Sequence, residues 1–284
     1  MGTDVREAAG DKWADGLLAV DVGNTVTRLG LFDGGELVAT WEATTPERCT
    51  SDEARLVVTG FLDALARRKG AGEGDAAAAT AAFRPAGSIL SCVVPDLVDV
   101  WARALHAECG RRTLVVGPGL KTGIRMRYRD PAEVGPDRVA DLAAALADYG
   151  GPLVVVDLGT TTNFEVLDAE GTFVGGIIAP GLALGAKALA QAAARLPRVE
   201  LKAPASVIGT STREAMQAGV VMGEVARIDG LVDLVLSELG CEAPVVVTGA
   251  DATAMAALLR HEARADDTLT LRGLRRLYEL NRRR

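Results

Sequence analysis

Apolar residues along this chain fall into short, nearly unbroken runs that end in polar turns rich in glycine and threonine. The segment "LLAVDVGNTVTRLGLFDGGELVATWEAT", which begins at Leu17, predicts three strands joined by two turns, with "DGG" as the second turn. The segment "LVVVDLGTTTNFEVLDAEGTFV", which begins at Leu153, repeats this order of strands and turns. Strand runs that are separated by helical segments predict an α/β protein.

Three segments between and after these strands predict helices. They span residues 52–70, 97–110 and 136–150, and each ends at a glycine, which is common just after the last helical turn. Residues 1–14 are expected to be a loose tail, and residues 71–82 an alanine-rich connector.

The two strand segments align without gaps at an offset of 136 residues. Asp21 matches Asp157, and Gly23, Thr25 and Gly35 match Gly159, Thr161 and Gly171. An offset of this size is too long for a solenoid repeat and indicates duplication of a whole domain. We therefore expect an N-terminal domain at residues 15–149 and a C-terminal domain at residues 150–284. Chance similarity between two hairpins is the alternative.

Each of the matched turns places an aspartate at the end of a buried strand and a glycine two residues later. The glycine permits a tight turn, and the N–H groups and threonine hydroxyls that follow can donate to phosphate oxygens. The aspartate repels phosphate unless a cation lies between them. Two such turns predict a nucleotide clamped between Asp21 and Asp157. An Asx-turn that merely ends a strand is the alternative.

The composition excludes several other classes of protein. The 284 residues carry a net charge of −7, which argues against nucleic acid or an anionic membrane as a partner. No apolar run is long enough to span a membrane, and the polar first sixteen residues do not resemble a secretory signal. The four widely spaced cysteines fit a reducing cytoplasm better than a zinc site. The P-loop and Rossmann glycine motifs are absent.

Six blocks in order from Leu17 to Asn281 resemble the type III pantothenate kinases. They are "DVGNT", "GPGLKTGIRMRYRDPAEVGPDRVAD", "VVVDLGTTTNFEVLD", "GGIIAPGLALGAKALAQAAARLPRVEL", "VIGTSTREAMQAGVVMGEVARIDGLV" and "LTLRGLRRLYELN". The resemblance implies two duplicated ribonuclease-H-like domains of the acetate kinase/sugar kinase/Hsp70/actin superfamily, with mixed sheets flanked by helices. It also implies phosphorylation of the 4′-hydroxyl of pantothenate by ATP, the first step of coenzyme A biosynthesis. The implied partners are Mg²⁺, a monovalent cation such as K⁺ or NH₄⁺, and a second copy of the chain that completes the active site.

The resemblance also implies roles for the residues that match its motifs. The first phosphate turn would comprise Asp21, Gly23, Asn24 and Thr25, and the second Gly159, Thr160 and Thr161. Asp21 would hold Mg²⁺ directly or through water, and Asp157 would lie near the monovalent cation. Asp137 would be the general base, although helix capping is the simpler interpretation of this aspartate by itself. Residues implied to contact pantothenate are Tyr128, Gly135, Asp137, Arg138 and Ala193.

Several positions depart from the family pattern. Ala193 stands where a threonine is usual, and loss of that hydroxyl removes one neutral hydrogen bond, about 0.5–1.5 kcal/mol. Glu165 replaces an aspartate, Ala250 a glycine and Asp141 an asparagine, while Arg28 stands where lysine is frequent. Two alternatives therefore stay open. One is a related phosphotransferase with a different hydroxyl acceptor, and the other is a non-catalytic regulatory protein on the same scaffold.

Overall fold

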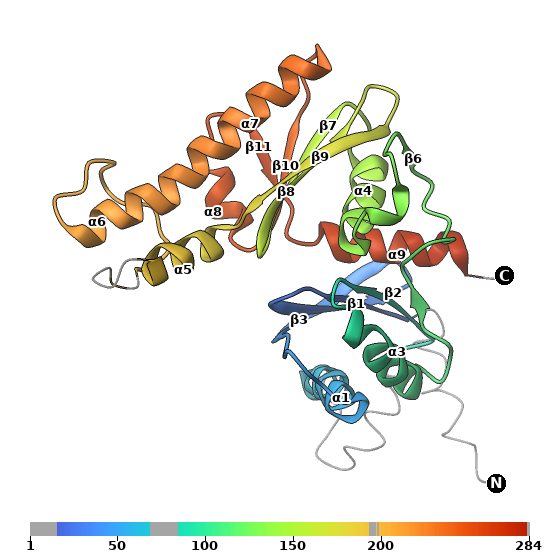
Figure 1. The fold of residues 1–284 in the computed structure, drawn as a ribbon. Helices are drawn as coiled ribbons and strands as arrows, with labels where there is room; N and C mark the ends of the chain where they lie inside the picture. The colour runs from blue at the N-terminus through green and yellow to red at the C-terminus, as the bar shows by residue number, and fades with distance from the viewer. Residues whose placement is uncertain (1–15, 69–84, 193–196, 198, 283–284) are drawn as a thin grey trace, which may run out of the picture. The chain divides into compact units, whose positions relative to one another are not determined.

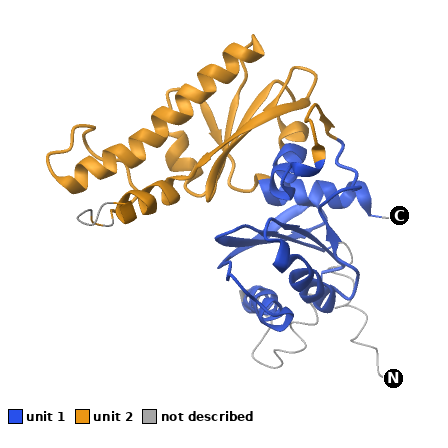
Figure 2. Ribbon diagram, in the orientation of Figure 1, with its two compact units in different colours: residues 1–123, 132–144, 270–284 blue, residues 124–131, 145–269 orange. Residues whose placement is uncertain are grey.

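The computed structural model describes residues 16–68, 85–192, 197 and 199–282. The predicted tail at 1–14 and the connector at 71–82 lie outside these residues, as does Ala193. The chain forms two compact units (Figure 2). Unit 1 comprises residues 1–123, 132–144 and 270–284, and unit 2 comprises residues 124–131 and 145–269. The domain boundary between residues 149 and 150 stays a prediction.

Unit 1 is built on a five-stranded sheet with the order β3-β2-β1-β4-β5 (Figure 1). Strand β1 lies antiparallel to β2 and parallel to β4, so the predicted strand–turn–strand–turn–strand unit is confirmed. The strands are β1 (Leu17–Val22), β2 (Val26–Asp33), β3 (Glu36–Thr44), β4 (Gly87–Cys92) and β5 (Leu114–Val115).

Helices cover both faces of this sheet (Figures 1 and 2). Alternate residues of β1, such as Val20, join a buried core with helices α1 (Ser51–Arg68) and α3 (Pro95–Cys109). On the other face, glycines in β2 and β4 lie against side chains of α9 (Leu269–Asn281). Because side chains alternate along a strand, Asp21 belongs to the α9 face. The first part of α4 (Pro136–Asp148) also packs on α9.

Unit 2 contains a six-stranded sheet with the order β11-β10-β7-β8-β9-β6. Its strands are β6 (Arg125–Met126), β7 (Leu153–Leu158), β8 (Thr161–Leu167), β9 (Thr172–Pro180), β10 (Val245–Gly249) and β11 (Ala263–Ala265). The apolar residues Val154 and Val156 of β7 form a core with α7 (Gly223–Leu239) and α8 (Ala252–Ala256). Asp157 therefore lies on the face of the sheet opposite α7. The remaining segments are η1 (Pro131–Glu133), α5 (Leu182–Ala192), α6 (Thr212–Gln217) and the π-helical turn η2 (Ala218–Met222).

The two matched hairpins differ in register by one residue. In unit 1, residues 23–25 join β1 to β2, and Asp21 lies opposite Arg28. In unit 2, only residues 159–160 join β7 to β8, and Asp157 lies opposite Asn163. A shift of one residue exchanges which side chains share a face of the sheet. The two aspartates therefore have different cross-strand neighbours despite the gapless alignment of the sequences.

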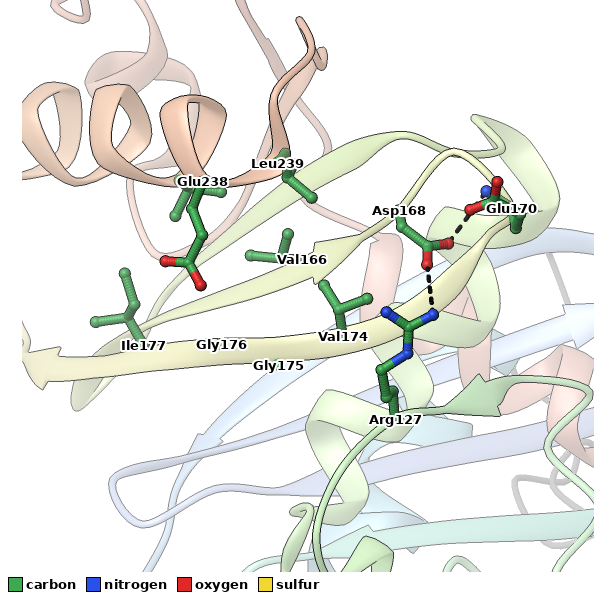
Figure 3. Close-up of a pocket in the computed structure, with 11 residues that line it drawn as sticks. Arg127, Val166, Asp168, Glu170, Val174, Gly175, Gly176, Ile177, Glu238 and Leu239 are labelled. Carbon is green, nitrogen blue, oxygen red and sulfur yellow. Dashed lines mark hydrogen bonds and ion pairs between the residues drawn. The ribbon is translucent and has the colours of Figure 1, made fainter.

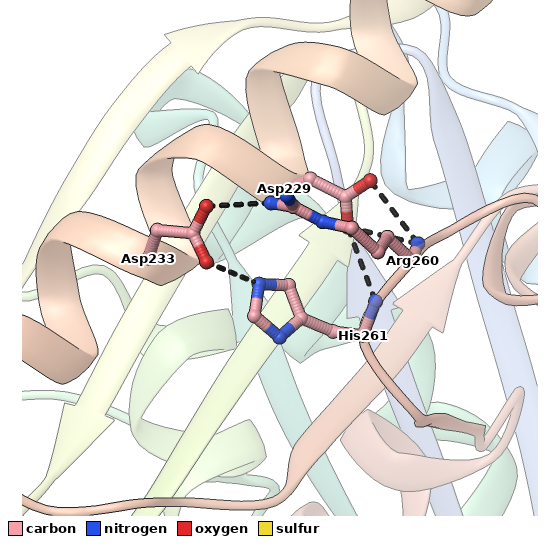
Figure 4. A network of polar contacts seen from close by, with 4 residues as sticks. All are labelled: Asp229, Asp233, Arg260 and His261. Carbon is pink, nitrogen blue, oxygen red and sulfur yellow. Dashed lines mark hydrogen bonds and ion pairs between the residues drawn. The ribbon is translucent and has the colours of Figure 1, made fainter.

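A polar network ties α7 to the loop before β11 (Figure 4). Buried Asp229 accepts hydrogen bonds from the backbone N–H groups of Arg260 and His261, at 3.1 and 3.3 Å. Asp233, one turn later, accepts from the side chains of Arg260 at 2.5 Å and His261 at 2.9 Å. The Arg260 guanidinium is the main cause that lowers the pKa of the Asp233 carboxyl. The side chains of Arg260 and His261 therefore have a structural role, because they hold the loop before β11 against α7.

Replacing Asp229 by alanine should lower the free energy of unfolding by about 1–3 kcal/mol, because two backbone N–H groups lose their buried acceptor. Urea denaturation measures this loss. Asp233→Ala is the matched control on the same helix, and because its carboxylate is half exposed it should lower stability less than Asp229→Ala does. Equal losses in the two variants would contradict this interpretation.

None of the helices in the described part of the chain combines the length and the apolar character needed to cross a bilayer.

Candidate functional site

The first turn presents its polar groups at the end of β1. Asp21 is buried, while Asn24 and Thr25 are exposed. The N–H of Gly23 donates to the carbonyl of Val26 at 3.0 Å, which closes the turn. A Cβ atom on Gly23 would lie 2.9 Å from that same carbonyl oxygen, so a side chain there would strain the turn. The sequence motif thus forms a tight turn with a buried acid at its base and exposed donors at its tip.

Arg28 is a candidate residue to which the sequence alone assigned little weight. It lies directly opposite Asp21 on β2, so both side chains project from the same face of the sheet. Its Nε donates to the exposed carboxylate of Glu42 at 2.9 Å. A guanidinium beside the first turn adds a positive group suited to phosphate oxygens. The pairing register of β1 and β2 places Arg28 beside Asp21, and the length of the turn at residues 23–25 sets that register.

The second turn is held more firmly. The N–H of Gly159 donates to the carbonyl of Thr161 at 2.9 Å, and that of Gly181 donates to the carbonyl of Thr160 at 3.0 Å. Gly249, with a φ of +90°, approaches so closely that a Cβ there would lie 2.7 Å from Oδ1 of Asp157. The backbone at Gly159 and Gly249, at the ends of β7 and β10, therefore lies close to this carboxylate, and only glycine fits at the closest approach.

Helix α7 supports the second turn through a buried carboxylate that sequence reasoning missed. The hydroxyl of Thr162 donates to Oε1 of Glu224 at 2.6 Å, and both side chains are buried. Arg227 forms an ion pair with the same carboxylate and donates to the carbonyl of Pro180 at 2.5 Å. The network connects β8, the end of β9 and α7. Thr162 and Glu224 are 62 positions apart in the sequence, so no local motif predicts their contact.

Asp137 lies in the first turn of α4 without being its N-cap. The first helical hydrogen bond runs from the N–H of Val139 to the carbonyl of Gly135, at 3.0 Å. The carboxylate of Asp137 accepts the N–H of Arg138 at 2.8 Å, so it also satisfies one free donor of the helix start. Burial raises the pKa of Asp137, and the contact with Arg138 opposes that rise. A Cβ on Gly135 would lie 2.5 Å from the Asp137 carboxylate.

The structure brings some of the predicted substrate residues together. Gly135, Asp137 and Arg138 lie in unit 1, on the side of its sheet that Asp21 faces. Tyr128 lies in unit 2, where its ring stacks on Phe173 with centroids 5.5 Å apart. Asp157 also belongs to unit 2, so the closure of Asp21 and Asp157 on one nucleotide stays a prediction.

Among the residues that the structure describes, no cluster of three acidic, histidine or cysteine side chains forms a protein-only metal site. Asp21 can offer one carboxylate to a divalent cation that brings most of its ligands as phosphate and water, and Arg28 opposite would attract the same phosphate. The donor set around Asp157 is different, because a neutral amide, that of Asn163, stands opposite the carboxylate.

Two cavities in unit 2 contain none of the predicted site residues. One, of about 510 Å³, lies between β9 and the end of α7 (Figure 3). Its Arg127 pairs with Asp168 at 3.8 Å, and Asp168 accepts the N–H groups of the β8–β9 turn. This cavity adjoins the α7 face of the sheet, whereas Asp157 lies on the opposite face. The other, of about 750 Å³, is lined by residues that include Tyr149 and His261.

Comparison with solved structures shows the fold. A protein from Campylobacter jejuni assigned to the Baf family of transcriptional activators is 19% identical, with a TM-score of 0.53 over 93% of this chain and 98% of that one. A protein from Sinorhizobium meliloti assigned as a 2-dehydro-3-deoxygalactonokinase is 15% identical, with a TM-score of 0.55 over 93% and 96%. The α/β architecture of two mixed sheets flanked by helices is thus that of the sugar kinase and actin-like ATPase folds, as predicted.

Comparison of sequences identifies the family. The model of the type III pantothenate kinase family matches residues 17–234. The type III pantothenate kinase of Moorella thermoacetica is 39% identical over 265 residues, which cover 93% of this chain and 99% of that protein. That of Acidothermus cellulolyticus is 40% identical over 266 residues, or 93% and 98%. Matches of this extent include both acidic turns and the start of α4, and they show that the chain belongs to the type III pantothenate kinase family.

Proposed function

We propose that the protein transfers the γ-phosphoryl group of ATP to the 4′-hydroxyl of pantothenate, the first step of coenzyme A biosynthesis. The observation that carries this proposal is the pair of strand-end acids, Asp21 and Asp157, each followed by a tight glycine turn with exposed donors, in a chain of this family. Backbone N–H groups and threonine hydroxyls of both turns would bind the phosphates of ATP.

Asp137 is the proposed group that orients the attacking hydroxyl. Phosphoryl transfer proceeds through a loose transition state, so the base mainly aligns the hydroxyl and accepts its proton late. Burial raises the pKa of the Asp137 carboxyl, which makes its carboxylate a stronger proton acceptor than an exposed aspartate. The buried Arg138 beside it would bind the carboxylate of pantothenate through two parallel hydrogen bonds. Gly135 and Tyr128 complete the proposed pocket, and Ala193 would contribute a contact without a hydroxyl.

The proposal includes Mg²⁺ at the first turn and a monovalent cation, K⁺ or NH₄⁺, at Asp157. When bound, Mg²⁺ would neutralise phosphate charge. Asp21 would hold it directly or through its water shell, with Arg28 sharing the neutralisation. The side chain of Arg28 is 23% exposed, so it can turn toward a ligand without being pulled out of the core.

Arg28→Gln should therefore raise the KM for ATP and lower kcat/KM by about 10–100-fold, the equivalent of one lost charge-assisted contact. Steady-state kinetics with varied ATP measures this. Glu42→Gln is the control, since it removes only the exposed partner of Arg28 and should change kcat/KM by less than about threefold. An unchanged KM for ATP in Arg28→Gln would exclude a phosphate contact.

A homodimer is also part of the proposal. Helix α5 is rich in alanine and leucine, yet none of its residues is buried. Leu184 and Leu189 are 42% and 39% exposed on this helix, and Val207 and Ile208 are 66% and 83% exposed nearby in the chain. Exposed apolar surface of this kind is typical of an interface, and a second copy of the chain is the partner that the family suggests. Sedimentation at micromolar concentration tests it, because a monomer would remove the argument for a shared site.

The cysteines of the described part of the chain are free thiols, which suits the cytoplasmic location that we include in the proposal.

Coupled ADP release with the purified protein, MgATP, K⁺ and a panel of hydroxyl acceptors tests the activity. Turnover on pantothenate that disappears in Asp137→Asn supports the proposed function. Turnover only on another acceptor would support a related phosphotransferase. Absence of turnover with every monovalent cation would overturn the proposal in favour of a non-catalytic role.

A further inference from the structure

We infer that Asn163 supplies an amide oxygen ligand to the monovalent cation at Asp157. The inference rests on the cation site of the proposed function and extends it to a residue that no part of that proposal uses. It follows from three observations. They are the register of β8 against β7, the burial of Asn163, and the lack of a hydrogen-bond partner for its amide oxygen among the described residues.

The register places Asn163 directly opposite Asp157 in the antiparallel pair β7–β8. Side chains at opposed positions lie on one face of the sheet, with Cβ atoms about 4.5–5.5 Å apart. On the other side of Asp157, Thr248 of β10 occupies the opposed position in the parallel pair. An amide, a carboxylate and a hydroxyl thus form a row across three strands, at the edge where the second turn begins.

The buried amide oxygen of Asn163 needs a hydrogen-bond donor or a cation as its partner. The residue is 6% exposed, and its Oδ1 is buried without a hydrogen-bond partner among the described residues. A buried polar atom without a hydrogen-bond partner destabilises the folded protein unless a ligand binds to it. Since the oxygen belongs to a side chain on the face of Asp157, a cation held by the carboxylate would also satisfy the amide.

The chemistry of the row favours a monovalent ion. Neutral carbonyl-type oxygens replace the hydration shell of K⁺ efficiently, whereas Mg²⁺ releases its water reluctantly. The equivalent acid of unit 1 has Arg28 in the opposed position, and a guanidinium there repels a cation that is bound to the carboxylate alone. The one-residue difference in register therefore assigns the monovalent site to the turn of unit 2.

Thermal unfolding of the full-length protein, without ATP or pantothenate, tests the inference. The chlorides of K⁺, NH₄⁺, Na⁺ and choline are compared at a constant ionic strength of about 0.1 M. The Tm of the unmodified protein should rise by about 2 °C or more in K⁺ or NH₄⁺ relative to choline. Asn163→Leu, which keeps the shape and removes the oxygen, should abolish this rise, and Asn163→Asp, which keeps an oxygen acceptor, should retain it.

Asn281→Leu is the matched control. The Asn281 amide donates to the carbonyls of Lys121 and Leu277, each at 2.8 Å, so its loss should lower Tm while leaving the K⁺-dependent rise intact. Should Asn163→Leu fail to fold, Asn163→Ala and a titration with Tl⁺, followed by thallium NMR, make the same comparison. A K⁺-dependent rise of equal size in Asn163→Leu and the unmodified protein would overturn the role of Asn163, and no rise in either would overturn the cation site itself.

Because the measurement uses neither substrate, its outcome is separate from that of the kinase assay. A K⁺ effect that Asn163→Leu loses would stand even if pantothenate were not the acceptor.

Discussion

Asp137→Asn should lower kcat for phosphorylation of pantothenate by about 10²–10⁴-fold, the usual contribution of a positioned general base. The amide still occupies the space and still hydrogen-bonds, but it accepts no proton. The KM values for ATP and pantothenate should change much less than kcat. Steady-state kinetics with both substrates varied measures the two effects separately.

The same substitution should leave the protein at least as stable as before. Burial raises the pKa of Asp137 above its ordinary value of 3.8, so folding disfavours the ionised form. Below the pKa of the unfolded chain both states are protonated and carry no penalty. As pH rises through the folded pKa, the unmodified protein loses stability that Asp137→Asn retains. Urea denaturation at acidic and neutral pH should show the difference growing with pH.

The raised pKa also predicts the shape of the pH–rate profile. The acidic limb of kcat/KM should lie above pH 3.8, and it should be absent from the residual activity of Asp137→Asn. Glu133→Gln is the charge-matched control, because this exposed carboxylate precedes α4 and its loss should leave the profile unchanged. A full-rate Asp137→Asn enzyme would exclude Asp137 as the base.

Gly273→Ala should be the most destabilising single-methyl substitution that we predict, at about 3 kcal/mol or more. The Cβ atom would overlap the backbone carbonyl of Ala140, so helices α9 and α4 would have to separate. Backbone atoms at a close helix contact cannot move aside as a flexible side chain does. Thermal and urea unfolding should both show the loss.

Gly230→Ala in α7 is the matched control. Apart from the neighbouring backbone of α7 itself, no atom lies within 4 Å of the position that its Cβ would take, so alanine should add about 0.5–1 kcal/mol of stability by its higher helix propensity. The same chemical change should thus have opposite signs in the two helices. Since α4 carries Asp137, Gly273→Ala should also reduce kcat, whereas Gly230→Ala should not. Equal effects of the two substitutions on stability would show that α9 and α4 do not pack as described.

The strands that carry the two acidic turns were predictable because their signals are local. Apolar runs that end in Asp-x-Gly define β1 and β7, and the gapless repeat identified them as equivalents. The start of α4 was also predicted, although capping was only a partial description of Asp137. By contrast, strand β5 (Leu114–Val115) extends over only two residues. Its apolar run is short, and pairing with β4 ends at that point.

The contacts that complete the second turn could not be predicted. No motif in the sequence distinguishes Glu224, and its partner Thr162 is one of three consecutive threonines. Their contact requires α7 to pack on one particular face of the sheet. Asn163 is similarly unremarkable in the sequence, because its importance comes from the residue across the strand.

The sequence by itself determined the family, the α/β class and the two acidic turns at the ends of β1 and β7, because each of these depends on short contiguous motifs. The tertiary structure decided which side chains those turns meet. A turn shorter by one residue sets an amide opposite Asp157 where an arginine stands opposite Asp21. Helix α9, at the far end of the chain, covers the sheet of the first unit. Such pairings arise from register and long-range packing, which leave no periodic signal along the chain.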